Sequence, residues 1–157
     1  TISAVIAAPW GVTVSPFFTY RSALPTHTIE GPDLNRDGNP VDKTAMAYRY
    51  TGLDETTGRA TFEEAGTCDT VNCSRRAPFS QLNLRVSRGF RVAGALRIEA
   101  IAEVFNLFNA KNPGGFNTAQ FTTAGAANSG FMQPTSFAGD FQAGEQRVGQ
   151  VGFRFTF

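Results

Sequence analysis

The sequence predicts an all-β chain whose antiparallel strands cross a membrane as one segment of a β-barrel. Apolar and polar residues alternate over several long runs, and two tight turns alternate with two long polar connections. Strands of soluble domains usually span about 5–6 residues, whereas a tilted strand that crosses a bilayer needs about 9–11. The best of these runs reach the second length. We therefore expect strands at approximately 1–8, 11–21, 80–89, 95–108 and 146–157.

The segment 80–109 carries the clearest alternation. In its first run one face consists of Leu82, Leu84 and Val86, and the other of Gln81, Asn83, Arg85 and Ser87. After a break at residues 89–94 a second run follows, with an apolar face formed by Leu96, Ile98, Ala100, Ala102 and Val104. Two such runs joined by a tight turn predict a hairpin. A helix over the second run stays open, because its apolar residues also recur at helical spacing.

The remaining strands carry features of a membrane boundary. The run 1–8 ends at a tight turn that contains Trp10, and tryptophan favours the membrane interface. The run 11–21 alternates but contains Pro16, which cannot donate a hydrogen bond to a neighbouring strand. The last run has apolar residues at alternate positions, namely Val151, Phe153, Phe155 and Phe157. Such a row would promote aggregation in water, whereas lipid would stabilise it.

Two long connections, at residues 22–79 and 109–145, separate these runs, and the first of them shows no sustained period. Ordinary connections span about 4–6 residues, but long extracellular loops and short periplasmic turns are typical of outer-membrane barrels. We therefore expect the long loops to be extracellular and the C-terminus to be periplasmic. Five strands are odd in number and too few to close a barrel. The missing strands are expected upstream in the same polypeptide or in another chain.

Composition and charge argue against several classes of function. The net charge is +1, so neither a polyelectrolyte partner nor nucleic acid is expected. His27 is the only histidine, and no nucleophile or phosphate-binding motif accompanies it, so we do not expect an enzyme. The adjacent carboxylates Glu63 and Glu64 are interpreted as a solvated polar face rather than as an acid/base pair.

Cys68 and Cys73 lie five positions apart in a polar segment. We prefer a disulfide, which would place this segment in an oxidising compartment, over a pair of free thiols. A metal site is less favoured, because the spacing lacks the second pair of ligands that makes a zinc site convincing.

The segment that begins at residue 33 has the spacing of a calcium-binding loop. Its candidate ligands are Asp33, Asn35, Asp37, Asn39 and Asp42. Side-chain oxygens stand at positions 1, 3, 5 and 10 of this loop, glycine stands at position 6, and a backbone carbonyl would serve at position 7. The bidentate glutamate of position 12 is replaced by Thr44. A plain Asx-type turn therefore stays open as the alternative to calcium.

Candidate contact residues for a solute fall in two groups. Charged residues occupy the polar faces of the predicted strands, where they would line the lumen: Arg85, Arg97, Glu99, Glu103 and Arg154. Opposite charges on neighbouring strands predict cross-strand ion pairs against a plug, with contact to a solute as the alternative. Aromatic residues recur in the second long connection, at Phe116, Phe121, Phe131, Phe137 and Phe141. They either contact a ligand or pack the loop over the barrel mouth.

Several motifs together resemble those of one family. They are the opening segment 10–25, the loop 33–39, residues 81–85, the run AEVFNLFN at 102–109 and the closing segment 151–157. On these residues the chain resembles the C-terminal end of the barrel of a TonB-dependent outer-membrane receptor. The resemblance is to the Oar-like subgroup, whose full-length members carry an N-terminal carboxypeptidase-regulatory-like domain. It covers essentially all 157 residues.

The resemblance implies about five C-terminal strands of a 22-stranded barrel and the import of a large or scarce solute, energised by TonB. The plug domain and the TonB box would lie upstream of Thr1. The residues Val151, Phe153, Phe155 and Phe157 resemble the signal that the barrel-assembly machinery recognises. Implied partners are the lipid bilayer, the remaining strands and plug, TonB and this machinery.

Two other functions stay open at this point. One is a structural outer-membrane or surface-assembly component that binds a partner through its long loops. The other is a soluble β-sandwich adhesion module.

Overall fold

The computed structural model describes residues 1–39, 42–137 and 147–157, and its regular structure is β-strand. Pairing is antiparallel throughout, apart from one parallel contact between two short segments of the second unit and one isolated bridge, which confirms the all-β prediction. In these ranges no helix is long and apolar enough to cross a membrane. The chain divides into two compact units, formed by residues 1–21, 79–112 and 138–157, and by residues 22–78 and 113–137.

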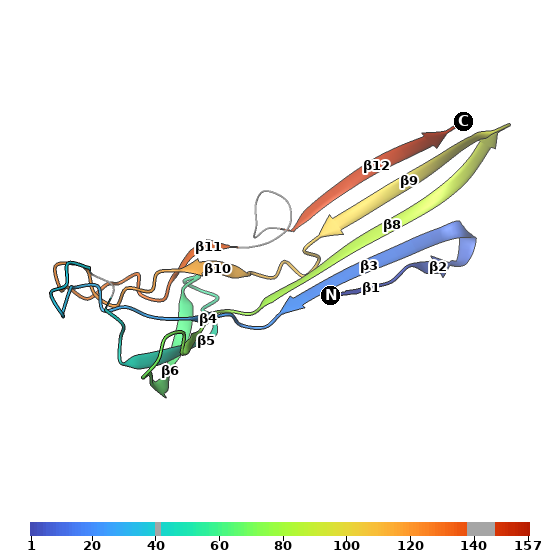
Figure 1. Cartoon of the computed structure of the whole chain (residues 1–157). Coiled ribbons are helices and arrows are strands. Elements are labelled where there is room, and N and C mark those ends of the chain that lie inside the picture. The colour runs from blue at the N-terminus through green and yellow to red at the C-terminus, as the bar shows by residue number, and fades with distance from the viewer. Residues whose placement is uncertain (40–41, 138–146) are drawn as a thin grey trace. The chain divides into compact units, whose positions relative to one another are not determined.

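Unit 1 is a single open sheet (Figure 1), with the strand order β1-β3-β8-β9-β12 and with β2 also paired to β3. Its strands are β1 (Ile2–Ser3), β2 (Ile6–Ala8), β3 (Val12–Arg21), β8 (Phe79–Ala93), β9 (Leu96–Phe105) and β12 (Val148–Thr156). The strand β12 forms one edge of the sheet, and β1 with β2 forms the other. Both edges therefore offer backbone groups for pairing with further strands.

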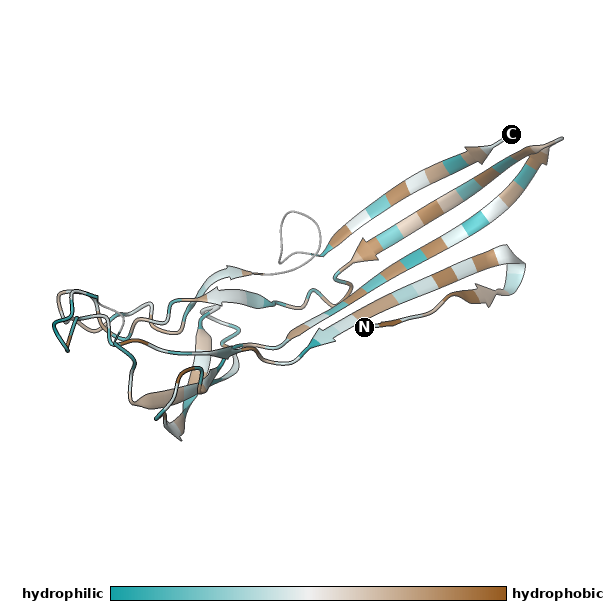
Figure 2. Cartoon of the chain, viewed as in Figure 1, coloured by the Kyte–Doolittle hydropathy of each residue, from teal (hydrophilic) through white to brown (hydrophobic). Residues whose placement is uncertain are grey.

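The register of unit 1 sorts its residues into two faces. Residues opposite one another in antiparallel strands share a face. One row across the sheet consists of Val14, Val86, Ala102 and Val151, and the adjacent row consists of Ser15, Arg85, Glu103 and Gln150. Apolar and polar rows alternate in this way along the strands, as the bands of Figure 2 show. We call these two sides the apolar face and the polar face.

The two strand boundaries of the central hairpin differ from the prediction. The predicted break at residues 89–94 is wrong, because Gly89, Phe90 and Arg91 pair with β9 and β8 ends only at Ala93. In the other direction β9 ends at Phe105 rather than at residue 108. Asn106 follows with a φ of 51°, a left-handed conformation that asparagine tolerates and that ends the strand. The helical alternative for this segment is wrong, since residues 96–105 form a strand.

The first and last predicted strands are also shorter than expected. Residues 1–8 form two short strands, β1 and β2, instead of one. The last strand begins at Val148, while residue 146 of the predicted range 146–157 lies outside the described residues.

The connections of unit 1 alternate between its two ends. Arg21 pairs with Phe79, and Phe105 pairs with Val148, so both long connections leave the same end of the sheet. The opposite end carries the tight turn after β2, which is the 3₁₀ turn η1 (Pro9–Gly11), and the turn between β8 and β9. This arrangement agrees with the predicted alternation of turns and long connections.

Unit 2 contains regular structure that the polar sequence did not indicate. The first connection holds β4 (Pro25–Thr26), β5 (Met46–Leu53), β6 (Ala60–Thr67) and β7 (Ser74–Arg75), in the sheet order β4-β7-β5-β6. The second holds β10 (Pro113–Phe116) and β11 (Pro134–Phe137). The pairing of β5 with β6 shifts register twice, between Met46 and Tyr48 and between Tyr50 and Gly52. Each shift disrupts the period of two, which is why the alternation was not visible.

The two connections fold together into one small core. Its buried apolar residues are Ala47, Ala60, Cys68 and Met132. The rings of Tyr50, Phe62 and Phe116 meet pairwise edge to face, with centroids 5.7–6.1 Å apart. The amide of Gln133 adds two bonds to the backbone of Ala60, which donates at 2.9 Å and accepts at 3.1 Å. Residues more than fifty positions apart in the sequence are thus held in one unit.

Candidate functional site

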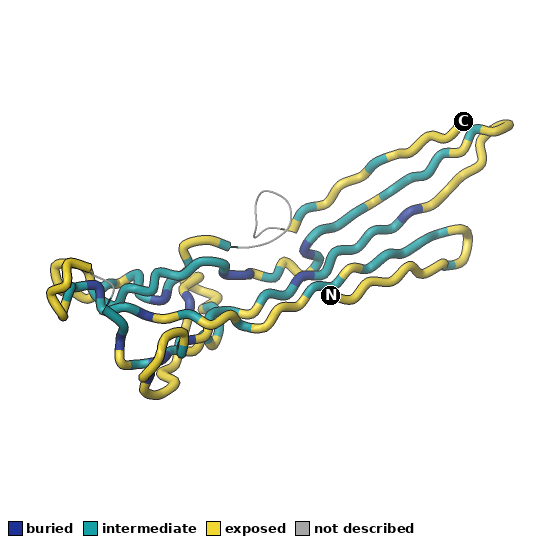
Figure 3. Tube along the Cα trace, in the orientation of Figure 1, coloured by how far each residue is buried: buried dark blue, intermediate teal, exposed yellow. Residues whose placement is uncertain are grey.

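Burial in unit 1 is inverted relative to that of an ordinary domain. The described buried residues of this unit are Gln81, Ser87, Asn106 and Asn112, all of them polar. On the apolar face of β12, Val151, Phe153 and Phe155 are 81%, 68% and 55% exposed. Figure 3 shows these strands as exposed or intermediate over most of their length. A sheet of this kind needs a non-aqueous neighbour for its apolar face.

The central hairpin does not bury its apolar residues either. Leu84 on β8 and Ile98 on β9 are both only partly buried. The structure therefore provides no closed apolar interior beneath this sheet in the described part of unit 1.

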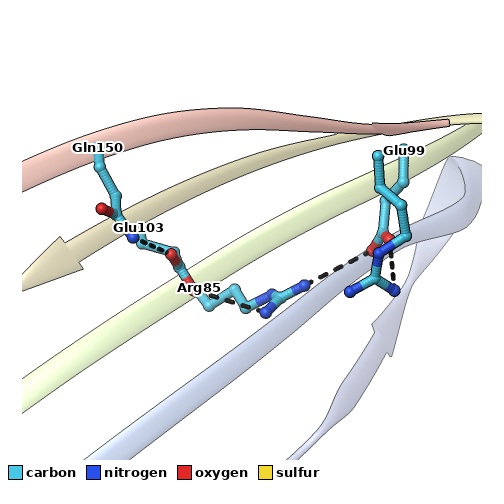
Figure 4. Close-up of polar contacts among 5 residues, drawn as sticks. Arg85, Glu99, Glu103 and Gln150 are labelled. Carbon is cyan, nitrogen blue, oxygen red and sulfur yellow. Dashed lines mark hydrogen bonds and ion pairs between the residues drawn. The ribbon is translucent and has the colours of Figure 1, made fainter.

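The polar face carries a connected set of side chains, which we call the charge ladder: Arg85, Glu99, Glu103, Gln150 and Arg154. The guanidinium of Arg85 lies 3.5 Å from the carboxylate of Glu103 and 3.9 Å from that of Glu99. Arg154 Nη1 lies 3.3 Å from Glu99 Oε2. Figure 4 shows how Arg85 reaches both carboxylates and how the Gln150 amide donates to Glu103.

The register explains why these groups meet. Arg85, Glu103 and Gln150 occupy one row across three strands, and Arg154 lies directly opposite Glu99. Opposite side chains on one face stand close enough to interact. Each side chain of the ion pairs keeps part of its surface in solvent, so each pair contributes modestly, about 0.2–1 kcal/mol.

A hollow of about 280 Å³ opens beside the charge ladder, with Ser15, Asn83, Arg85 and Glu103 among its lining residues. It combines carboxylate, guanidinium, amide and hydroxyl groups on a partly apolar floor. Such a surface can bind polar groups of a solute or of a neighbouring protein segment.

All but one of the residues that were predicted to face the lumen contact one another. Arg85, Glu99, Glu103 and Arg154 are joined in the charge ladder. Arg97 shares their face but stands opposite Arg91 and Thr156, and its side chain is exposed. Sequence reasoning did not select Gln150 as a site residue. The sequence did contain a signal for Gln150. It lies four residues before Arg154, and residues an even number of positions apart on a strand share a face.

The calcium prediction is not tested by the structure. The carboxylate of Asp33 accepts hydrogen bonds from the backbone N–H groups of Asp37 and Gly38, at 3.2 and 2.8 Å. Asp42 Oδ2 accepts from Leu34 N at 2.6 Å, and Asn35 Oδ1 accepts from Asp37 N. Asp37 Oδ1 accepts from Asn39 N. The two bonds to Asn35 and Asp37, each from the N–H two residues on, are those of Asx-type turns. In the described residues no cluster of three or more acidic, histidine or cysteine side chains is arranged to hold a metal.

The predicted disulfide is present. The sulfur atoms of Cys68 and Cys73 are bonded, and their Cα atoms lie 5.8 Å apart. Lys43 donates its ammonium group to the carbonyl of Cys68, and Arg75 donates to the carbonyl of Asn72 inside the loop. The disulfide thus closes the short loop that connects β6 to β7.

The aromatic residues of the second connection pack within unit 2. Phe116 lies against Tyr50 and Phe62, and Phe131 lies against Tyr48 with ring centroids 5.0 Å apart. Burial raises the pKa of Tyr48 above its usual value, and the nearby carboxylates of Glu64 and Glu30 raise the pKa further. Phe121 forms a bridge with Ala127, Phe137 belongs to β11, and Phe141 lies outside the described residues. Phe116 and Phe131 thus pack within unit 2, whereas a position of the loop over a barrel mouth stays a prediction.

His27 and the two consecutive glutamates, Glu63 and Glu64, lie in polar surroundings. The ring of His27 lies 3.4 Å from the side-chain oxygen of Asn72, and Glu63 pairs with Arg49 at 3.3 Å.

Comparison with known proteins gives no match. No family model, no curated protein and no solved structure matches the chain. The site is therefore interpreted from its geometry.

Proposed function

We propose that this chain is a segment of an outer-membrane β-barrel, in which the sheet of unit 1 crosses the bilayer. The observation that carries the proposal is the inverted burial of this sheet, with polar residues buried and phenylalanines and valines outward. Hydrocarbon stabilises such an apolar face, whereas water does not. The charge ladder on the opposite face suits a lumen that contains water or a polar plug.

The dimensions of the sheet support the same proposal. The strands β3, β8, β9 and β12 contain 10, 15, 10 and 9 residues. A tilted strand needs about 9–11 residues to cross a bilayer. All four strands reach this length, and both short turns stand at one end, which we assign to the periplasmic side.

The open edges of the sheet support membership in a larger barrel. A spanning sheet with unpaired edges is unstable in hydrocarbon, because its backbone groups lack hydrogen-bond partners. The edges β12 and β1–β2 therefore require further strands, from the same polypeptide or from another chain. With the resemblance noted above, this favours a TonB-dependent transporter that imports a large or scarce solute.

The intact mass of the native protein tests the transporter proposal. We expect a mass several-fold above 16.9 kDa, with a plug domain and a TonB box in the same polypeptide. A native chain of about 16.9 kDa would contradict the transporter and favour the structural component. Dependence on detergent is the control for the barrel itself, since a soluble adhesion module would stay in solution in plain buffer.

One observation favours the alternative of a structural or surface-assembly component. The two long connections form one folded unit with its own disulfide and aromatic core. A folded surface of this kind suits the binding of a partner. Substitutions at exposed residues of unit 2 would then abolish partner binding, and the protein would show no solute uptake.

A further inference from the structure

A single charged side chain interrupts the apolar face of unit 1. Within the described strands the residues of this face are apolar or small, apart from Tyr20, Ser80 and Arg88. Arg88 stands opposite Val12 on one side and Ala100 on the other, and it is exposed. Its guanidinium lies 4.9 Å from the centroid of the Phe90 ring, which is a cation–π contact and not an ion pair.

A hollow of about 290 Å³ adjoins this arginine on the same face. Its lining includes Val12, Val86, Arg88, Ala100, Ala102 and Phe153. The small side chains Ala100 and Ala102 lie between the larger residues of β8 and β12, and this difference in size creates the depression. The lining is almost entirely apolar, and Arg88 is its one charged residue. The hollow therefore has the chemistry of a site for an amphiphile with an anionic head.

The level of Arg88 in the sheet matches a membrane boundary. Its partner Val12 is the first residue of β3, directly after the turn that contains Trp10. Trp10 is 84% exposed, and tryptophan concentrates at membrane–water interfaces. A charged residue on a lipid-facing strand is costly near the middle of the bilayer but tolerated near its surface.

We infer that Arg88 and the adjoining hollow form a binding site for an anionic glycerophospholipid. The phosphate would contact the guanidinium of Arg88, and part of an acyl chain would lie in the hollow between β8 and β12. Charge complementarity and the apolar lining point to this occupant together. The inference rests on the proposed function, since it requires the apolar face to lie in a bilayer.

Fluorescence of Trp10 tests this inference directly. Trp10 is the only tryptophan among these 157 residues and lies two residues from Val12. With tryptophans elsewhere in the native protein replaced by phenylalanine, its fluorescence reports on lipid near the site. The protein is reconstituted in phosphatidylcholine vesicles that contain increasing fractions of brominated phosphatidylglycerol or of brominated phosphatidylcholine. We expect brominated phosphatidylglycerol to reach half-maximal quenching at a mole fraction about fivefold lower than brominated phosphatidylcholine does. A preference of this size is what the attraction between one arginine and an anionic lipid provides.

Three variants distinguish binding at this site from a general electrostatic attraction to anionic lipid. Arg88→Gln should remove the preference for phosphatidylglycerol, and Arg88→Lys should retain most of it. Arg91→Gln is the matched control, because Arg91 lies on the same strand but on the polar face, opposite Arg97. It should leave the preference unchanged.

The possible failures are distinct. Equal quenching by both brominated lipids in the wild type would overturn the inference while leaving the membrane proposal intact. A preference that persists in Arg88→Gln, or that Arg91→Gln abolishes equally, would also overturn it. If neither lipid quenches Trp10, the proposed function itself is wrong.

Discussion

Unit 1 and unit 2 differ in whether they bury apolar side chains. Unit 2 buries Ala47, Ala60, Cys68 and Met132 together with three polar residues, whereas the described buried residues of unit 1 are all polar, and its Phe153 and Phe155 are exposed. Because apolar burial is the main favourable term of folding in water, the sheet of unit 1 cannot be stable there alone. The comparison indicates that the two units are adapted to different surroundings, and the following predictions test it from the largest expected effect to the smallest.

The largest effect is expected for a charge on the apolar face. Ala102→Arg places a guanidinium toward lipid and should destabilise the protein in bilayers by about 2–4 kcal/mol, the cost near the middle of a membrane. Ile101→Arg is the matched control, because the adjacent position lies on the polar face near Glu99 and Glu103. Denaturant unfolding in lipid vesicles measures both. Equal costs for the two variants would mean that the faces do not differ in solvent.

Loss of the disulfide should affect unit 2. In the double variant Cys68→Ala/Cys73→Ala the short loop is no longer constrained in the unfolded chain, which costs roughly 2 kcal/mol. Amide hydrogen exchange followed by mass spectrometry should show faster exchange in β5, β6 and β7 and unchanged exchange in β8 and β9. If protection in β8 and β9 falls to the same extent, the two units do not unfold independently.

The charge ladder should contribute less than either of these. A double-mutant cycle with Arg85→Ala and Glu103→Ala should give a coupling energy of about 0.2–1 kcal/mol, since the partners are partly solvated. The coupling should weaken as salt is added, because mobile ions screen exposed charges. A coupling that is absent at low salt would indicate that Arg85 and Glu103 are not paired on the polar face.

The tyrosines of unit 2 should give the smallest effect. Burial raises the pKa of Tyr48 and of Tyr50 above the ordinary value, so the folded chain holds these protons longer than the unfolded chain. The stabilisation they provide is complete below the pKa of an unfolded tyrosine, about 10, and is lost as pH rises through the higher folded value. Unit 2 should therefore lose stability in alkali, as tyrosinate absorbance and exchange rates can follow. The double variant Tyr48→Phe/Tyr50→Phe should weaken this dependence, and an unchanged dependence would contradict the assignment.

Much of unit 1 was predictable because its residues alternate over long runs, and the register of β8 with β9 shifts only near the turn, between Arg91 and Ala93. The apolar and polar faces of β8 and β9 follow from the parity of the two runs, whereas the pairing of Leu84 with Val104 depends on the turn at residues 94–95, which the predicted break misplaced. The error at residues 89–94 has a physical reason: glycine and arginine interrupt the apolar pattern there, although backbone pairing does not depend on side-chain polarity. The end of β9 was missed because the apolar residues Leu107 and Phe108 continue beyond the turn at Asn106.

Unit 2 was not predictable from local patterns. The contact of Phe116 with Tyr50 and Phe62, and that of Gln133 with Ala60, join segments far apart in the sequence. The charge ladder was partly predictable, since the face of each charged residue follows from its parity, whereas the pairing of Arg154 with Glu99 depends on the register of β12. The assembly role of the C-terminal residues, the calcium site and the transport activity stay predictions.

The most direct measurement of the central claim is a nitroxide scan along β12 in lipid bilayers. Cys68 and Cys73 form a disulfide, and these 157 residues contain no free cysteine. With any cysteines elsewhere in the native protein replaced by serine, each introduced cysteine is the only reactive thiol. Labels at Val151, Phe153 and Phe155 should collide with dissolved oxygen, which concentrates in hydrocarbon, and labels at Gln150, Gly152 and Arg154 should collide with a water-soluble nickel complex. The account predicts this alternation with a period of two. Equal access of the nickel complex to both sets, or protection of the apolar set from both reagents, would contradict it.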